Sequence, residues 1–393
     1  MMKMKDIFIA IALILCFAII AVPARADEVA DELASKALAT FNRFAYELAT
    51  PELAYTLALN KDLWNTLIDS LVPPVSSVKE QIRQMALKKA PTLKPVATPP
   101  DSAAVNNKYF ANSYTQVISF GDSMSDNGNM FQVSIDLADW GLPMPPNDRG
   151  RFSNGPVVLE IMSYILNRPL VNYAYGGAES GYKSLIPAYG FEIGMLTEVD
   201  DFISNLGWKS ADSKALYVIW TGPDDFYKGF SIYDTTTAYT VAQNIKTAMI
   251  KLYWRGARNF FIPGMPDLSI TPAARAYQTT EENYLEAAQT RSIEMKNALD
   301  AMLKFFAKRY PRARVRTFDM FTYSQVELPK FAALGYNVQD ACYIPPFFGL
   351  PGPVCENPDM YLFWDLNHPT AWGSSIIGEA FAKAAVGAPL PSR

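Results

Sequence analysis

A short apolar segment that ends in a glycine and a serine constrains this chain more than any other feature. Residues 117–120, Val-Ile-Ser-Phe, predict a buried strand, and Gly121, Asp122 and Ser123 follow at once. Because Gly121 permits a sharp turn, the strand would deliver the Ser123 hydroxyl to the carboxyl edge of a sheet, where open α/β sheets place their ligand sites. The same three residues also suit an ordinary turn after a strand.

Apolar and helical segments alternate along the rest of the chain. We expect strands at 170–175, 215–220, 258–264 and 315–321, and helices at 157–166, 236–253, 280–309 and 370–384. Strands that alternate with helices predict a parallel, doubly wound α/β sheet. Residues 151–155, Arg-Phe-Ser-Asn-Gly, are interpreted only as a turn before a helix.

The N-terminus has the features of a secretory signal peptide. Two lysines precede the apolar run at 7–22, and an A-x-A sequence at 24–26 fits a cleavage site. We therefore expect residues 1–26 to be removed and the mature chain to begin at Asp27, in a secreted or periplasmic protein. An uncleaved membrane anchor is the alternative, although the run is slightly short for a span.

The segment that follows the signal peptide carries no motif for chemistry. Residues 27–90 are rich in Ala, Leu, Glu and Lys, with apolar residues at helical spacing, and they predict a helical extension that packs on the main domain. A helix that binds a membrane surface or a chaperone is the alternative. Residues 91–107 are rich in proline and indicate a linker, which leaves 108–390 for the main domain.

The composition limits the partners of the chain. Its 393 residues, 50% of them hydrophobic and 13% aromatic, suffice for one large domain and a smaller part. The net charge of −4 gives no electrostatic reason to expect nucleic acid as a partner. We expect no metal centre, because His368 is the only histidine and the sequence contains no thiol cluster.

Two cysteines, Cys342 and Cys355, remain after signal cleavage. In an oxidising compartment such a pair predicts one disulfide, and two free buried thiols are the alternative. The segment between them, 343–354, is apolar, aromatic and rich in proline, and it has no charge. An exposed apolar patch of this kind suits a lid or lip that faces lipid, whereas a packed loop is the other interpretation.

Four sequence blocks resemble, in the same order, those of the GDSL, or SGNH, hydrolases. They are FGDSMSDNGN at 120–129, NYAYGGA at 172–178, WTGPDDF at 220–226 and DLNHP at 365–369. The resemblance implies a three-layer α/β/α fold with a flavodoxin-like parallel sheet. It also implies a serine esterase mechanism that needs no cofactor.

The resemblance assigns roles to individual residues. Ser123 is the implied nucleophile, His368 the base that takes its proton, and Asp365 the carboxylate that orients the imidazole. The backbone N–H groups of Ser123 and Gly177 are implied donors to the oxyanion. A glycine suits this task because a backbone donor needs close approach.

Asp224 departs from the family pattern. The third block usually reads Gly-x-Asn-Asp, and its Asn amide is a further oxyanion donor. A carboxylate there would repel the oxyanion by roughly 4 kcal/mol at contact distance and an effective dielectric of about 20. Three interpretations stay open: Asp224 is protonated and donates, it turns away and leaves two backbone donors, or the enzyme is crippled.

The blocks resemble most the secreted bacterial branch of phospholipase A, lysophospholipase and glycerophospholipid:cholesterol acyltransferase. We therefore expect a lipolytic acyl hydrolase that acts on lipid esters at a membrane or micelle surface, with a sterol as a second acyl acceptor. A protease that cuts the Cys342–Cys355 loop would activate the enzyme if that loop is a lid. The alternatives are a short-chain or glycan O-acetyl esterase and a catalytically weakened lipid-binding protein.

Overall fold

The computed structural model describes residues 114–138, 141–185, 193–345 and 353–387. The predicted signal peptide, helical extension and linker lie outside these residues, as does the middle of the segment between the two cysteines. The corresponding domain boundaries therefore stay predictions. Within the described ranges, no helix is both long enough and apolar enough to span a bilayer.

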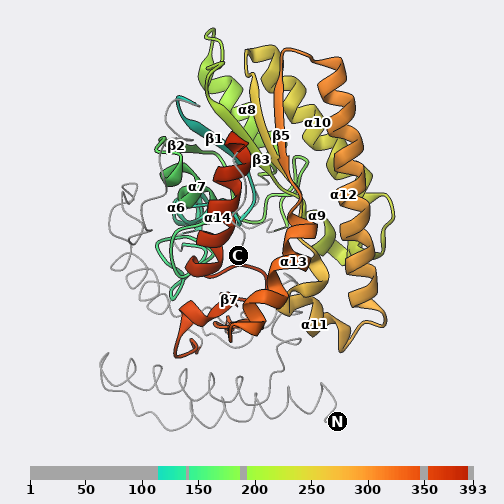
Figure 1. Cartoon of the computed structure of the whole chain (residues 1–393). Coiled ribbons are helices and arrows are strands. Elements are labelled where there is room, and N and C mark those ends of the chain that lie inside the picture. Colours follow the sequence, from blue (N-terminus) through green and yellow to red (C-terminus); the bar gives the residue numbers. More distant parts are fainter. Residues whose placement is uncertain (1–113, 139–140, 186–192, 346–352, 388–393) are drawn as a thin grey trace, which may run out of the picture. The chain divides into compact units, whose positions relative to one another are not determined.

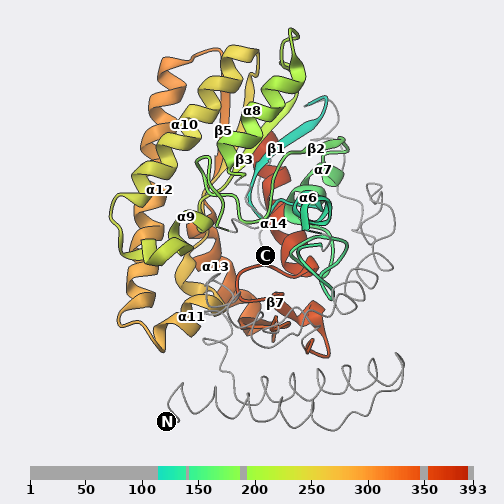
Figure 2. The ribbon, with the colours of Figure 1, turned by 180° about the vertical axis from the view of Figure 1, so that it is seen from behind.

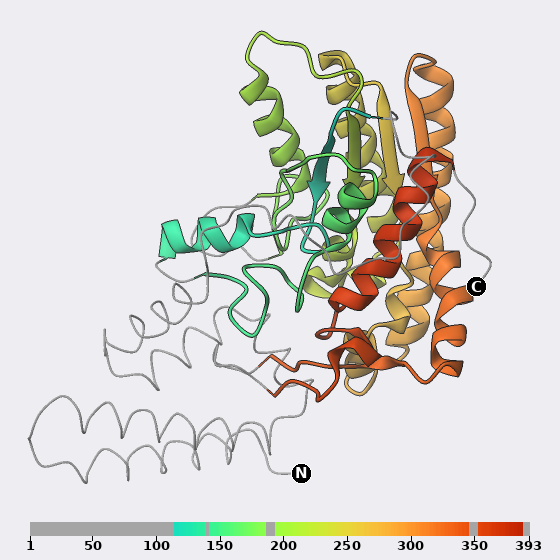
Figure 3. The same ribbon diagram turned by 60° about the vertical axis from the view of Figure 1, so that its left-hand side comes forward.

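Five parallel strands form one sheet, in the order β2-β1-β3-β4-β5. They are β1 (Val117–Gly121), β2 (Leu170–Asn172), β3 (Leu216–Trp220), β4 (Asn259–Pro263) and β5 (Arg314–Phe318). Every residue of β1, β3 and β4 is buried, because these strands are covered on both faces. The order is that of flavodoxin-like sheets, so the predicted parallel α/β fold is confirmed. Figure 3 shows the strands pointing the same way.

Helices cover both faces of this sheet, which Figures 1 and 2 show from opposite sides. They are α6 (Asn129–Ala138), α7 (Val158–Ile165), α8 (Met195–Leu206), α9 (Pro223–Tyr227), α10 (Thr237–Arg255), α11 (Pro272–Gln278), α12 (Tyr284–Arg309), α13 (Met320–Ala333) and α14 (Ala371–Val386). Helices α7 and α14 pack together on one face, and α8, α10 and α12 pack on the other. The result is a three-layer α/β/α arrangement.

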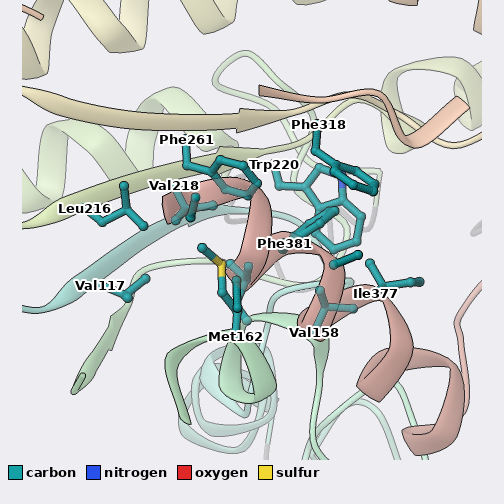
Figure 4. Packing of buried hydrophobic residues seen from close by; sticks show 14 of the residues in the cluster. Val117, Val158, Met162, Leu216, Val218, Trp220, Phe261, Phe318, Ile377 and Phe381 are labelled. Carbon is teal, nitrogen blue, oxygen red and sulfur yellow. The ribbon is translucent and has the colours of Figure 1, made fainter. Parts of the chain in front are cut away.

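The core on the α7 and α14 face centres on Phe381 (Figure 4). This ring lies edge-on to Trp220, Phe261 and Phe318, with centroids 4.9, 5.4 and 5.3 Å away. Burial of such a side chain stabilises a fold by about 1.5–3 kcal/mol. Since Phe381 belongs to α14, these contacts fix the helix that begins just after His368.

Two predicted strands end earlier than expected. The regular strand predicted at 170–175 extends only to Asn172, whose side-chain oxygen accepts the N–H of Ala174. The N–H groups of Tyr173 and Tyr175 still donate to the carbonyls of Ser119 and Gly121 on β1, at 2.9 and 3.2 Å. The strand predicted at 315–321 stops at Phe318, because Asp319 caps the following helix α13 through the N–H of Thr322.

A second, two-stranded parallel sheet was not predicted. It consists of β6 (Asn337–Ala341) and β7 (Tyr361–Phe363). Strand β6, Asn-Val-Gln-Asp-Ala, has almost no apolar pattern, and Val338 is its one buried residue, so its sequence gives little sign of a strand. Strand β7 matters for function because it leads directly to Asp365 and His368.

Candidate active site

The structure brings Ser123, His368 and Asp365 into direct contact. The Oγ of Ser123 lies 2.7 Å from Nε2 of His368, and both carboxylate oxygens of Asp365 lie 2.8 Å from Nδ1. The Asp365 carboxylate also accepts the backbone N–H groups of Asn367 and His368 at 2.9 and 2.8 Å. The Asp365 carboxylate thus fixes both the turn at 365–368 and the orientation of the His368 ring.

The end of β1 places Ser123. Gly121 has a φ of +152°, and a Cβ there would lie 2.0 Å from the carbonyl oxygen of Trp220 on β3. Only glycine allows the two strands to end so close together. Ser123, only 8% exposed, therefore follows the strand at the carboxyl edge of the sheet, as the sequence predicted.

His368 lies in the turn between the end of β7 and the start of α14. The N–H of Trp364 donates to the His368 carbonyl at 2.7 Å and closes the turn. Thr370 then caps α14 by accepting the N–H of Gly373 at 3.1 Å. A strand end on one side and a helix start on the other leave the imidazole little freedom.

The surroundings of His368 favour its charged form. Burial lowers the pKa of the imidazole, but the charge and hydrogen bonds of Asp365, together with the charge of Asp122, outweigh that effect. The pKa therefore lies above its ordinary value of 6.5. A base raised in this way accepts a proton from a serine hydroxyl more readily than an isolated imidazole does.

Two buried carboxyls hold the loop that carries Gly177. Asp126 accepts the N–H of Gly176 at 2.8 Å, and Glu198 of α8 accepts the N–H groups of Gly121 and Tyr175 at 2.7 and 3.1 Å. Glu198 thus links the end of β1 to Tyr175, the residue before the Gly176–Gly177 turn, and Asp126 holds that turn at Gly176. Burial raises the pKa of Asp126 to about 6 and raises that of Glu198 well above its ordinary value.

The backbone donors at this turn differ in availability. The Gly176 N–H is used by Asp126, whereas in the described part of the chain no protein acceptor takes the N–H of Ser123 or of Gly177. Gly177 also has a φ of +79°, which favours glycine. Of the two glycines, Gly177 is therefore the one whose N–H can bind a substrate oxygen.

Asp224 follows β3 in the first turn of α9 and is 8% exposed. Its Oδ2 has no hydrogen-bond partner. Burial raises the pKa of this carboxyl well above its ordinary value, and the charged neighbours that act on it, Asp122, Asp225 and Glu179, are all acidic and raise it further. Both effects shift this carboxyl toward its neutral form, whose O–H can donate.

Asp122 also belongs to this acidic surrounding. Burial raises its pKa to about 7, and the hydrogen bond from the Met124 N–H and the charge of His368 oppose the shift. Burial likewise raises the pKa of Asp225 to about 6. Despite these carboxyls, no His, Cys, Asp and Glu cluster within the described ranges has the arrangement of a metal site.

Sequence reasoning missed the part played by Phe152. Its ring lies against the His368 ring, with centroids 5.2 Å apart. It also covers Gly176, where an added Cβ would lie 2.2 Å from the Phe152 ring. Phe152 therefore touches both the base and the turn that carries the free N–H of Gly177.

The two residues after Phe152 hold the other end of the histidine turn. Ser153 donates to the carbonyl of Pro369 at 2.9 Å, and Asn154 accepts the N–H of Ala371 at 2.7 Å. The interpretation of 151–155 as only a turn before a helix is therefore incomplete. These two hydrogen bonds join residues more than 200 positions apart, so no local sequence pattern predicts them.

The structure joins Cys342 and Cys355 in a disulfide. The bridge is close to the catalytic turn, because the N–H groups of Cys342 and Tyr343 donate to the carbonyls of Phe363 and Trp364 at 3.0 and 2.6 Å. The centre of the loop that the bridge closes, 346–352, lies outside the described residues. The prediction of a lid or a packed loop is therefore untested.

A serine, a histidine and an aspartate in contact at the carboxyl edge of a parallel α/β sheet are typical of serine hydrolases. Residues 117–381 match the GDSL-like lipase/acylhydrolase family. The chain belongs to this family, whose members are enzymes with esterase or lipase activity.

Several known proteins resemble the chain. The thermolabile hemolysin of Vibrio parahaemolyticus is 26% identical over 67% of this chain and 62% of its own length. The secreted effector protein SseJ of Salmonella typhimurium is 26% identical over 65% and 60%. The phosphatidylcholine-sterol acyltransferase of Aeromonas hydrophila is 29% identical over 43% and 50%. The chain thus spans about 60% of the length of the first two relatives.

Among solved structures, an acetyl xylan esterase covers 67% of this chain and 96% of its own, with a TM-score of 0.33 and 14% identity. A likeness this weak carries no argument about function.

Proposed function

We propose that this protein is a serine carboxylic-ester hydrolase that cleaves lipid esters through an acyl-Ser123 intermediate. The observation that carries the proposal is the 2.7 Å contact between Ser123 Oγ and His368 Nε2, with Asp365 at the other ring nitrogen. This arrangement suits one reaction above all, the transfer of an acyl group to the serine oxygen.

Acylation begins when Ser123 Oγ attacks the ester carbonyl carbon. His368 Nε2 takes the serine proton, and Asp365 stabilises the imidazolium that forms. The tetrahedral intermediate then collapses, and His368 returns the proton to the leaving alcohol. The products of this half-reaction are the alcohol and an ester of Ser123.

Three donors stabilise the negative oxygen of the intermediate. They are the N–H groups of Ser123 and Gly177 and the O–H of a neutral Asp224. The acidic neighbours and burial of Asp224 support the protonated form, which replaces the amide donor usual in the family. Each such donor contributes about 3–4 kcal/mol to the stability of the transition state.

Deacylation uses the same residues. His368 removes a proton from water or from an alcohol, whose oxygen attacks the acyl-Ser123 carbonyl, and the imidazolium then protonates the departing Ser123 Oγ. Water gives the free acid, and an alcohol gives a new ester. Hydrolysis and acyl transfer are therefore two outcomes of one intermediate.

We propose phospholipids and lysophospholipids as substrates and a sterol hydroxyl as the second acceptor. The support is the named activity of the phosphatidylcholine-sterol acyltransferase relative and the uncharged, aromatic segment 343–354. The predicted signal peptide and the relative described as a secreted effector support a secreted or periplasmic bacterial location. A protease that cuts the Cys342–Cys355 loop is part of the same proposal.

The test uses the purified full chain and its Ser123→Ala variant. Each is incubated with phosphatidylcholine or lysophosphatidylcholine vesicles, with and without cholesterol, and fatty acid and cholesteryl ester are measured together. We expect fatty acid from the wild type alone and cholesteryl ester when cholesterol is present. Equal release by the variant, or no release from either lipid, would contradict the proposal.

A further inference from the structure

The side chain of Asn172, the last residue of β2, has all its hydrogen-bonding groups engaged. Its Oδ1 accepts the Ser119 hydroxyl at 2.7 Å and the Ala174 N–H at 3.1 Å. Its Nδ2 donates to the Ser125 carbonyl at 2.7 Å and to Oδ1 of Asn127 at 2.9 Å. These bonds use the whole donor and acceptor capacity of a carboxamide. The mechanism above gives this residue no task.

The orientation of this amide follows from its backbone partners. A backbone N–H can only donate, and a backbone carbonyl can only accept. The Ala174 N–H therefore requires the amide oxygen of Asn172, and the Ser125 carbonyl requires the amide nitrogen. A carboxylate of the same shape could accept from Ala174 in the same way, but it would have no hydrogen to donate to Ser125.

The two backbone partners of Asn172 belong to the two segments that supply backbone donors to the oxyanion. Ser125 lies two residues after Ser123, in the loop that follows β1. Ala174 lies three residues before Gly177 and is fully buried. One side-chain amide therefore connects the backbone that carries the Ser123 N–H to the backbone that carries the Gly177 N–H.

Asn129 and Asp126 support the same connection from the loop side. The Nδ2 of Asn129 donates to the carbonyls of Asn172 and Ala174 at 3.0 and 2.9 Å. Asp126 accepts the backbone N–H of Asn129 at 2.7 Å and that of Gly176 at 2.8 Å. The segment that begins at Asn172 is thus held against the loop after the nucleophile at several points, so a shift of its start would be passed on to the Gly176–Gly177 turn.

We propose that Asn172 is a positioning residue that sets the relative position of the Ser123 and Gly177 N–H groups in the oxyanion site. It acts through the backbone of Ser125 and Ala174 and not through contact with the substrate. Donors must lie about 2.7–3.1 Å from the oxyanion, so a small shift of one segment against the other weakens transition-state binding. The inference rests on the proposed ester hydrolase function and adds a residue to its oxyanion site.

The substitution Asn172→Asp tests this role because it changes one hydrogen bond and keeps the shape of the side chain. The introduced carboxyl can still accept the Ala174 N–H. Its ionised form faces the Ser125 carbonyl without a hydrogen, whereas its protonated form can donate there. The variant should therefore work better at low pH, relative to the wild type, than at high pH.

The charged groups closest to this amide in the hydrogen-bond network are mainly acidic. Asp126 follows Ser125 in the loop, and Glu160 of α7, which is paired with Arg151 at 2.7 Å, accepts from Nδ2 of Asn127 at 3.5 Å. Nearby carboxylates disfavour a further negative charge, so the pKa of the introduced carboxyl should lie above its ordinary value of about 3.9. Burial raises the pKa of Asp126 to about 6 in the wild type as well. The ratio of variant to wild-type kcat is therefore the quantity to compare.

The measurement is kcat and KM on a soluble ester between pH 5 and pH 8. For Asn172→Asp we expect the kcat ratio to the wild type to fall about tenfold over this range, with little change in KM. Asn172→Ala, which removes every bond of the amide, should lose about tenfold in kcat at every pH. Asn297→Asp is the matched control, because Asn297 is exposed on α12 and the change in charge is the same. Its kcat ratio should stay constant.

A constant kcat ratio for Asn172→Asp, or a fall that Asn297→Asp shares, would overturn the positioning role. A rise in KM with unchanged kcat would overturn it as well. Loss of the near-UV circular dichroism signal in both Asn172 variants at both ends of the pH range would do the same, because the residue would then serve the fold. Failure of the proposed function looks different: the wild type would hydrolyse no ester in a Ser123-dependent manner.

Discussion

At the residue scale, the two ring nitrogens of His368 have different tasks. Nδ1 contacts only acceptor oxygens of Asp365, so it carries the hydrogen of the neutral ring, and Nε2 is left to accept a proton from Ser123. This tautomer is assigned from the hydrogen-bond partners. Because the chain has no other histidine, no second imidazole can replace it.

The first prediction concerns Asp365→Asn. His368 must be neutral to act as a base, and its pKa lies above 6.5, so kcat/KM should fall as the pH drops through a value above 6.5. Removing the Asp365 charge lowers the imidazole pKa and moves this acid limb to lower pH. At pH 8 the variant should also lose about 10⁴-fold in kcat, the size of loss seen when such an aspartate is replaced.

The measurement is a pH–rate profile of wild type and variant on a soluble ester. Asp200→Asn serves as the control, because Asp200 is a half-exposed partner of Lys251. An acid limb at the same pH in wild type and Asp365→Asn would contradict the assigned role.

The second prediction concerns Asp224→Asn. A neutral Asp224 donates to the oxyanion, and it stops donating when it ionises as the pH rises. Since its pKa is raised well above the ordinary value, this loss belongs to the alkaline limb of the profile. The asparagine amide cannot ionise, so the variant should keep its activity to higher pH than the wild type.

Asp224→Leu provides the matched comparison, because it fills similar space without a donor. It should lose about 10²–10³-fold in kcat at the pH values where Asp224 is neutral, the typical cost of one oxyanion donor. This deficit relative to the wild type should shrink at higher pH, where Asp224 ionises. Identical pH profiles for wild type and Asp224→Asn would exclude the protonated donor.

The sequence predicted part of this site and left part of it open. The resemblance of the Gly-Asp-Ser segment and of the block around the single histidine to the GDSL hydrolases pointed to Ser123 and His368 before the structure was known. Asp224 could not be resolved in the same way, because its protonation depends on burial and on Asp122, Asp225 and Glu179. None of these effects is visible in the local sequence.

At the scale of elements, the segment 151–155 acts as a support for the histidine turn. Phe152 packs against the His368 ring and covers Gly176, and Ser153 and Asn154 bond to the chain on either side of α14's start. The fold thus joins the two halves of the site, which come from opposite ends of the domain sequence.

The third prediction is that Phe152→Ala lowers kcat about tenfold and changes KM little. The reason is that the imidazole and the Gly176–Gly177 turn lose a common contact that orients the reacting groups. Steady-state kinetics on a short ester provide the measurement. Phe305→Ala, at a 58% exposed position on α12, is the control. A KM effect with unchanged kcat would contradict a positioning role.

Elements were predictable where their pattern is local. The strongly apolar strands β1, β3 and β4 and the long helices α10 and α12 match the expected segments closely. Strand β2 is regular only as far as Asn172, although the N–H groups of Tyr173 and Tyr175 still donate to β1. Strand β5 ends at Phe318, where Asp319 caps α13. Strand β6 was missed because it is polar, and only its pairing with β7 makes it a strand.

At the scale of the whole molecule, the disulfide supports the C-terminal part of the site. Cys342 and Tyr343 pair with the residues just before Asp365, and Trp364 donates to Asn147 at 2.9 Å. The bridge closes a short loop, with its cysteines 13 positions apart. The chain-entropy estimate for such a loop is about 3 kcal/mol.

The fourth prediction is that the double variant Cys342→Ser, Cys355→Ser melts roughly 6–12 °C below the wild type. Thermal unfolding followed by circular dichroism gives the midpoints. Reduction of the wild type should lower its midpoint to that of the variant, and the reductant should leave the variant unchanged. Equal midpoints for oxidised wild type and variant would contradict a stabilising bridge.

The central claim is that His368 activates Ser123 for attack. Its most direct test is labelling of the purified full chain with a fluorophosphonate, followed by peptide mass spectrometry. We predict one phosphonyl group per chain, on Ser123, in the wild type, and no labelling of His368→Ala under the same conditions. Labelling of a different serine, or equal labelling of Ser123 in the His368→Ala variant, would contradict the account.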